Sequence, residues 1–146
     1  MKGVYLVTRA LIPALLKSPS RTMITVGSAA GHFVEKGLSA YQTSKFAVCR
    51  FSEFVAKEYE ADGLIAVVVH PGAVATDLVG YLPEDFVKQF FTDKPELMAD
   101  TLTWLARERR EWLSGRFITA PWDMEELVAR KEEIVSRDLL KFRLTV

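Results

Sequence analysis

"GSAAGHFVEKGLSAYQTSKFAVCRF", residues 27–51, decides the fold of this chain, because it links the end of a β-rich run to the start of a long helix. Three of its side chains carry useful chemistry. Ser28 follows the predicted strand, and Tyr41 and Lys45 stand four residues apart at the start of the predicted helix. Residues at positions i and i+4 share one helix face. The spacing therefore predicts that Lys45 lies beside Tyr41.

This trio is typical of proton transfer. A free tyrosine side chain has a pKa of about 10, which makes it a poor proton carrier at neutral pH. A neighbouring ammonium favours the phenolate, so we expect Tyr41 to exchange a proton with a carbonyl or hydroxyl oxygen. A serine hydroxyl aimed at the same oxygen would hold it. Neither His32 nor His70 has a spacing that pairs it with Ser28, and this argues against acyl transfer.

Helical and β-rich segments alternate along the whole chain. Alternation of this kind predicts an α/β fold, with a parallel sheet and helices on its faces. The predicted helices span residues 2–16, 39–60 and 95–110 with a tail helix at about 123–142, and the predicted strands span 22–28, 64–70 and 115–119. Residues 77–93 are predicted as a loop or short helices rich in aromatics. Ligands of such sheets bind beyond the carboxyl ends of the strands, where the trio and "PGAVAT" (71–76) fall.

Composition excludes several classes of function. The chain has 146 residues, the size of one domain, and its 19 basic residues balance 19 acidic ones. We therefore expect neither a nucleic-acid partner nor an anionic membrane partner. The single cysteine, Cys49, can form no disulfide within the chain, which fits a reducing, cytoplasmic setting. The acid-free first 34 residues are typical of a mitochondrial transit segment, but also of an ordinary amphipathic helix and strand.

Three motifs together resemble the short-chain dehydrogenase/reductase family of the single-domain kind. "VGSAAG" (26–31) is similar to its serine segment, "YQTSK" (41–45) to its Tyr-x-x-x-Lys motif, and "PGAVAT" to the loop after the following strand. The resemblance covers about residues 2–119 and favours the helix-and-strand interpretation of the N-terminus over a transit segment. It implies an oxidoreductase that uses NAD or NADP on a small carbonyl or alcohol substrate. The residues it implies are the catalytic Ser28, Tyr41 and Lys45, and the cofactor-binding Tyr41, Lys45, Pro71, Gly72, Val74 and Thr76.

The sequence also departs from that family. It contains no glycine-rich phosphate loop, no Asn-Ala-Gly segment and no match to the catalytic asparagine. The resemblance is to the C-terminal portion of a Rossmann-like doubly wound sheet, with a nucleotide-binding half of roughly a hundred residues missing. We therefore expect the strand near residues 22–27 to have an unpaired edge. We also expect the chain alone to bind nicotinamide cofactor weakly or not at all, which low-micromolar binding would contradict.

Two other functions stay open at this stage. An inactive fragment could associate with a full-length relative, or with a second copy, through the predicted helices 2–16 and 39–60, which family members commonly use for pairing. A nucleotide-sugar epimerase or dehydratase shares the Tyr-x-x-x-Lys motif, but the chain after Lys45 is too short for its larger substrate region. The aromatic stretch 81–91 is either a substrate lid or ordinary packing.

Overall fold

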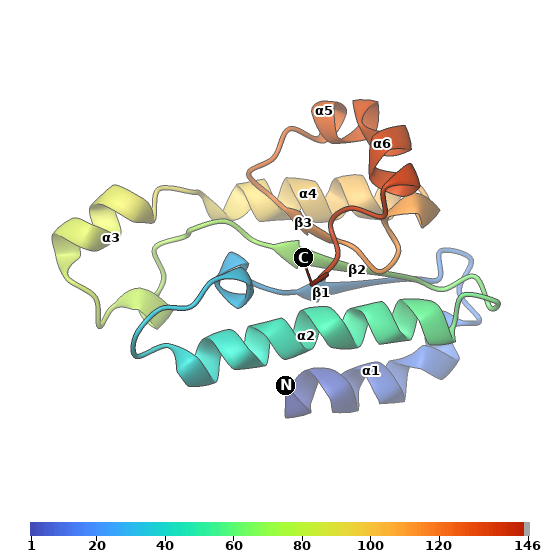
Figure 1. Ribbon diagram of the computed structural model, residues 1–146, viewed down its shortest axis with the longest axis horizontal. Coiled ribbons are helices and arrows are strands. Elements are labelled where there is room, and N and C mark those ends of the chain that lie inside the picture. The colour runs from blue at the N-terminus through green and yellow to red at the C-terminus, as the bar shows by residue number, and fades with distance from the viewer. Residues whose placement is uncertain (145–146) are drawn as a thin grey trace.

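The computed structural model describes residues 1–144 and contains a three-stranded parallel sheet (Figure 1). Its strands are β1 (Thr22–Val26), β2 (Ile65–His70) and β3 (Phe117–Thr119), in the order β1-β2-β3. Thr22 lies opposite Ile65, and Val68 lies opposite Phe117. The predicted α/β class and the parallel direction of the strands are confirmed.

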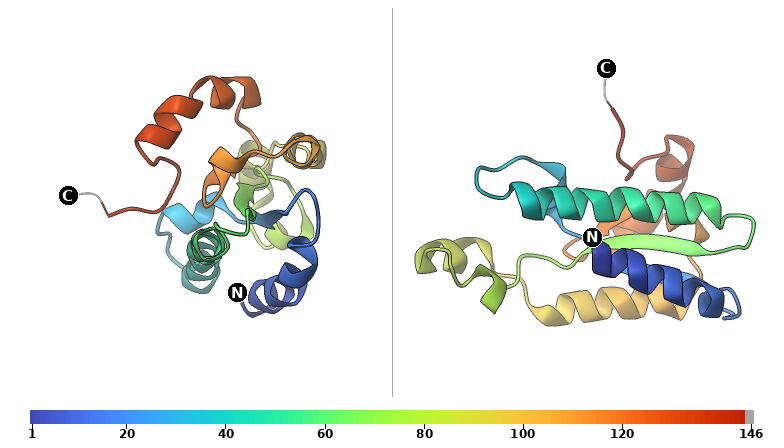
Figure 2. Two further views of the ribbon diagram at one scale, coloured as in Figure 1. Left: turned by 90° about the vertical axis from the view of Figure 1, so that its right-hand side faces the viewer. Right: turned by 90° about the horizontal axis from the view of Figure 1, so that it is seen from below.

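Helices cover both faces of this sheet. On one face lie α1 (Lys2–Leu15) and α2 (Ser39–Glu58), and on the other lie α4 (Pro95–Arg107), α5 (Met124–Ala129) and α6 (Lys131–Ser136) (Figures 1 and 2). No residue of β2 between positions 65 and 69 is more than 2% exposed. Its side chains alternate between two cores, with Val67 and Val69 on the α4 side and Ala66 on the α1 side. A strand covered on both faces explains the uninterrupted apolar run.

The short elements lie mostly at one end of the sheet. They are η1 (Ala29–His32), η2 (Asp77–Val79), α3 (Glu84–Phe90) and η3 (Glu111–Leu113). Helices α2 and α4 end earlier than predicted. α2 ends at Glu58 instead of residue 60, and α4 ends at Arg107 instead of residue 110. The turn after α2 contains Gly63 at a φ of 71°, a left-handed conformation that glycine adopts without strain.

The predicted continuous tail helix over residues 123–142 is wrong. Asp123 caps α5 by accepting from two backbone N–H groups, but the helix stops at Arg130, and α6 ends at Ser136. Asp138 and Leu140 then have φ angles of 49° and 63°, which turn the chain back toward the sheet. Burial of Leu139 and Leu140 against the core outweighs the local helical preference of this charged segment.

β1 is an edge strand within the part of the chain that the structure describes. Its only partner there is β2, so its other edge is open, as the sequence predicted. An apolar groove of about 330 Å³ runs between this edge and α1, and its lining includes Val4, Val7, Leu11, Leu15, Met23, Ile24 and Val26. Unpaired edges beside apolar surface favour pairing with another chain.

We expect Leu11→Lys to reduce self-association of the chain. Leu11 lines the groove and is 51% exposed, so a lysine there opposes docking of another strand while leaving the core intact. Sedimentation velocity should show wild-type oligomers that this variant shifts toward monomer. Val34→Lys, which adds the same charge at a residue 97% exposed and outside the groove, is the control and should behave as wild type. Identical size distributions for wild type and Leu11→Lys would contradict the prediction.

Candidate active site

The strand ends bring Ser28 to the carboxyl edge of the sheet. Gly27 follows β1 and donates its N–H to the carbonyl of Val69 at 2.9 Å, which keeps the chain in register with β2. A Cβ atom on Gly27 would lie 2.4 Å from Val68 Cγ1, so only glycine allows this approach. The next residue, Ser28, is 7% exposed, and its Oγ accepts from the N–H of Ala30 at 3.1 Å. This bond caps η1 and fixes the hydroxyl at the start of the turn.

The turn that carries Ser28 packs directly against α2. A Cβ atom on Gly31 would lie 3.0 Å from the backbone nitrogen of Phe46 and 3.2 Å from the carbonyl carbon of Lys45. The backbone of η1 therefore touches the helical turn that includes Lys45. Within the stretch 27–51, the turn at Gly31 is therefore in contact with the helix at Lys45 and Phe46.

Lys45 connects Tyr41 to the end of β1. Its Nζ lies 5.7 Å from the centre of the Tyr41 ring, which shows the shared helix face that the spacing predicted. The same Nζ donates to the carbonyl of Val26, two residues before Ser28, at 3.4 Å. Lys45 thus links Tyr41 on α2 to the end of the strand that leads to Ser28.

The loop after β2 supplies the other side of the site. Gly72 is buried with a φ of 95°, and Pro71 and Val74 are half-buried, whereas Thr76 is exposed. The N–H of Ala73 donates to Asp93 Oδ2 at 2.7 Å, and the N–H of Asp93 donates to the Ala73 carbonyl at 3.0 Å. Asp93 therefore fixes the loop. Sequence reasoning missed it, because 20 residues separate it from Ala73 and no motif marks it.

His70 ends β2 at the same edge. Its Nδ1 is buried and has no hydrogen-bond partner in residues 1–144. Burial lowers the pKa of His70, and the nearby Asp93 carboxylate opposes the shift without reversing it. The imidazole is therefore neutral at neutral pH. A buried polar atom without a partner is unusual in a folded protein and leaves capacity for a hydrogen bond at this edge.

Cys49 has no part in the site chemistry. It is buried on α2 at 2% exposure. Burial, followed by the nearby Glu53 carboxylate, raises the pKa of its thiol to about 11. A thiol of that kind is not a nucleophile at neutral pH.

Comparison with known proteins places this geometry in a family. The family model described as short chain dehydrogenase matches residues 1–86, more than half of the chain. Short chain dehydrogenase mpl6 of Monascus purpureus is 48% identical over 146 residues, covering 100% of this chain and 50% of its own length. Short chain dehydrogenase andI of Emericella variicolor is 46% identical with the same coverage. The chain belongs to the short chain dehydrogenase family, as its motifs predicted.

Solved structures agree on the fold. The Escherichia coli oxidoreductase yciK matches with a TM-score of 0.73 at 24% identity, over 84% of this chain and 49% of that protein. A putative short chain dehydrogenase of Escherichia coli CFT073, solved in complex with NADPH, matches with a TM-score of 0.71 at 25% identity, over 84% of this chain and 50% of that protein. The chain thus spans about half the length of the relatives that it matches.

Residues 1–144 contain neither a candidate membrane-spanning helix nor a candidate metal-binding cluster. No helix there combines the length and apolar character needed to cross a bilayer. No group of three or more His, Cys, Asp or Glu side chains there is arranged to hold a metal ion. The cytoplasmic setting expected from the single cysteine stays a prediction.

We expect Gly72→Ala to destabilise the fold more than Gly37→Ala. Both glycines have left-handed φ angles, 95° and 85°, so both substitutions cost about 1–2 kcal/mol of backbone strain. A Cβ on Gly72 would also lie 2.8 Å from Asp93 Oδ2, whereas one on Gly37 meets nothing within 4 Å. Displacing Asp93 should cost about 1–3 kcal/mol more. Urea unfolding measures both losses, and equal losses would contradict the role given to Asp93.

Proposed function

We propose that this chain carries the acid–base half of an NAD(P)-dependent oxidoreductase that interconverts small carbonyl compounds and alcohols. The observation that carries the proposal is the position of Lys45 Nζ. It lies over the Tyr41 ring at 5.7 Å and bonds to the Val26 carbonyl at 3.4 Å, beside the Ser28 turn. Such convergence at the carboxyl edge of a parallel sheet is the usual place for a ligand.

Ser28 is suited to donating a hydrogen bond to the substrate oxygen. Its Oγ already accepts the N–H of Ala30 at 3.1 Å, and its hydroxyl proton has no acceptor within the described residues. That proton is therefore available to an oxygen in the site. A fixed donor of this kind stabilises negative charge that develops on a carbonyl oxygen.

Tyr41 is the proton carrier in this scheme. During reduction its phenol gives a proton to the oxygen that Ser28 holds, and during oxidation the phenolate takes one from the alcohol. The Lys45 ammonium beside the ring stabilises the phenolate that remains. Lys45 has three N–H donors and uses one for Val26, which leaves two for Tyr41 or for ribose hydroxyls.

The described residues fit one end of a nicotinamide cofactor. Lys45 would hold the ribose, and the loop of Pro71, Gly72, Val74 and Thr76 would contact the nicotinamide, near the unpartnered Nδ1 of His70. The bound cofactor would supply or accept the hydride at the substrate carbon. The pyrophosphate has no matching site in residues 1–144, since no glycine-rich turn there joins a strand to a helix. Phosphate contacts must come from another segment.

A second function is favoured by the exposed surface of α1. Tyr5, Leu6 and Leu11 are each about half exposed, and the Tyr5 ring also packs on Phe51 of α2 with 5.4 Å between ring centres. The chain would then act without catalysis, by pairing with a full-length relative or with a second copy. The open edge of β1 supports the same proposal.

The decisive test is activity in a fusion that supplies the missing contacts. The chain is fused to the half of the Monascus purpureus relative that it leaves unmatched, and oxidation of NADH or NADPH is followed with a panel of aldehydes and ketones. We expect Tyr41→Phe and Ser28→Ala each to lower kcat at least about 100-fold, because proton transfer and oxyanion stabilisation are lost. Lys45→Met should lower kcat and raise the KM for the cofactor.

Matched controls come from the far end of α2. Lys57→Met in the last turn of α2 and Tyr59→Phe at its C-cap repeat the same chemical changes away from the site, and should keep full activity. Full activity of the Tyr41→Phe fusion would contradict the proposed proton transfer. A well-folded fusion that reduces nothing in the panel would favour the pairing function.

A further inference from the structure

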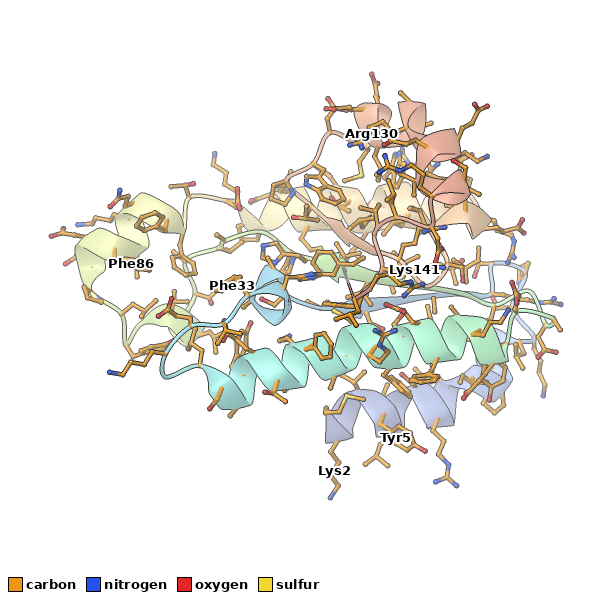
Figure 3. All side chains as sticks on the ribbon, in the orientation of Figure 1. Lys2, Tyr5, Phe33, Phe86, Arg130 and Lys141 are labelled. Carbon is orange, nitrogen blue, oxygen red and sulfur yellow. The ribbon has the colours of Figure 1, made fainter. Side chains whose placement is uncertain are left out.

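The end of the described chain runs from the start of β3 to α2. We call residues 139–143 the C-terminal strap; Figure 3 shows one of them, Lys141, between α6 and α2. The Leu140 carbonyl accepts from the N–H of Phe117 at 2.8 Å, so the strap bonds to β3. The Leu139 carbonyl accepts from buried Arg116, which also pairs with Asp138 at 3.3 Å.

Glu53 on α2 anchors the other end of the strap. Its Oε1 accepts the N–H of Phe142 at 3.0 Å, and its Oε2 accepts from Arg143 at 3.0 Å and from Arg50 at 2.8 Å. Arg50 also donates to the Phe142 carbonyl at 3.1 Å. The Glu53 side chain is only 13% exposed, so these charge-assisted bonds are partly shielded from water. Phe142 is thus bonded through both of its backbone groups.

The Phe142 ring stacks on the turn that begins at Ser28. Its centre lies 4.5 Å from the His32 imidazole, with 19° between the planes. Phe117 meets the same imidazole edge-on at 4.2 Å, and Phe46 meets Phe142 edge-on at 4.6 Å. His32 is the last residue of η1, and Ser28 is its cap. Rings of the strap and of β3 therefore pack on His32, an otherwise exposed residue, at the end of the turn that fixes the serine.

We propose that Phe142 is a positioning residue for Ser28, acting through His32 to hold the η1 turn in place. The proposal rests on the donor role given above to Ser28. A hydrogen-bond donor must be held to within about 0.5 Å to stabilise a developing charge. The turn is one short 3₁₀ segment, begun by the bonds from Ala30 N–H to Ser28 Oγ and from Gly31 N–H to the Ser28 carbonyl, both at 3.1 Å. Short turns of this kind have weak hydrogen-bond geometry and need tertiary contacts.

The protonation state of His32 fits this arrangement. Burial lowers the pKa of His32, so the ring is neutral at neutral pH and can stack without an uncompensated charge. The groups that influence the neighbouring His70 include His32, Lys45 and Asp93. His32 is already an exposed residue, and removing the Phe142 ring would open it further to water. Its pKa should then rise toward the ordinary value of about 6.5.

Amide hydrogen exchange of the 146-residue chain tests the proposal directly. We expect Phe142→Ala to speed exchange in residues 28–33 by about two- to tenfold, the range that corresponds to one aromatic stack. Phe142→Tyr keeps the stack and should restore the wild-type rate. Phe54→Ala removes another phenylalanine, 58% exposed on α2, and should leave residues 28–33 unchanged. Unchanged exchange in Phe142→Ala would overturn the proposal.

A second variant covers the case in which Phe142→Ala unfolds. Glu53→Gln keeps the acceptor for the Phe142 N–H but loses the charge that pairs with Arg143 and Arg50. It should loosen the strap without opening a cavity. Faster exchange confined to residues 28–33 and 139–143 would support the proposal, and faster exchange in residues 139–143 alone would overturn it.

Measuring kcat and KM in the fusion protein tests the positioning role of Phe142 separately from the catalytic role of Ser28. Phe142→Ala should lower kcat about three- to tenfold, with the KM for NADPH unchanged, because the donor is displaced and the cofactor contacts are not. Phe142→Tyr should restore kcat. If Ser28→Ala is fully active while Phe142→Ala still frees the turn, the role of Ser28 fails and the strap contact stands. If Ser28→Ala is inactive and Phe142→Ala keeps full kcat, the positioning role fails alone.

Discussion

The burial of β2 on both faces is the constraint on which the rest of the structure depends. Its residues 65–69 are at most 2% exposed, so helices must cover the sheet on both sides. Crossover connections then make the neighbouring strands parallel and bring their carboxyl ends to one edge. Ser28 and the loop of residues 71–76 follow two adjacent strands, and they lie together for that reason. The placement of the site is thus a consequence of how the core is buried.

Close backbone approach shapes the site at three glycines. Gly27 brings the end of β1 against β2, Gly31 brings the Ser28 turn against α2, and Gly72 leaves room for Asp93. Any side chain at these positions would push the elements apart by several tenths of an ångström or more. Lys45 then spans the remaining distance from α2 to β1. The elements of the site are thus in direct backbone contact at these glycines, and a side chain joins α2 to β1.

Patterns among residues close in sequence predicted the helices, the strands and the candidate residues Ser28, Tyr41 and Lys45. Contacts between residues far apart in sequence could not be predicted in this way. The apolar run of β2 and the four-residue spacing of Tyr41 and Lys45 act within one element, so the sequence displays them directly. Asp93 acts on a backbone group 20 residues away, and Phe142 acts on a turn more than a hundred residues earlier. The tail segment has the periodicity of one helix, yet it breaks at Arg130 and turns back after Ser136, because burial of Leu139 and Leu140 prevails. The catalytic roles themselves stay predictions.

The most direct test of a nicotinamide site at Lys45 and residues 71–76 uses a ligand that would contact only these residues. Nicotinamide mononucleotide carries the nicotinamide and its ribose but lacks the adenosine end. We expect millimolar titration to shift the backbone amide resonances of Lys45 and of residues 72–76. Lys45→Met should remove these shifts, and Lys57→Met should not. Shifts that are absent, or that fall on α5 and α6 instead, would contradict the claim that these residues form a nicotinamide site.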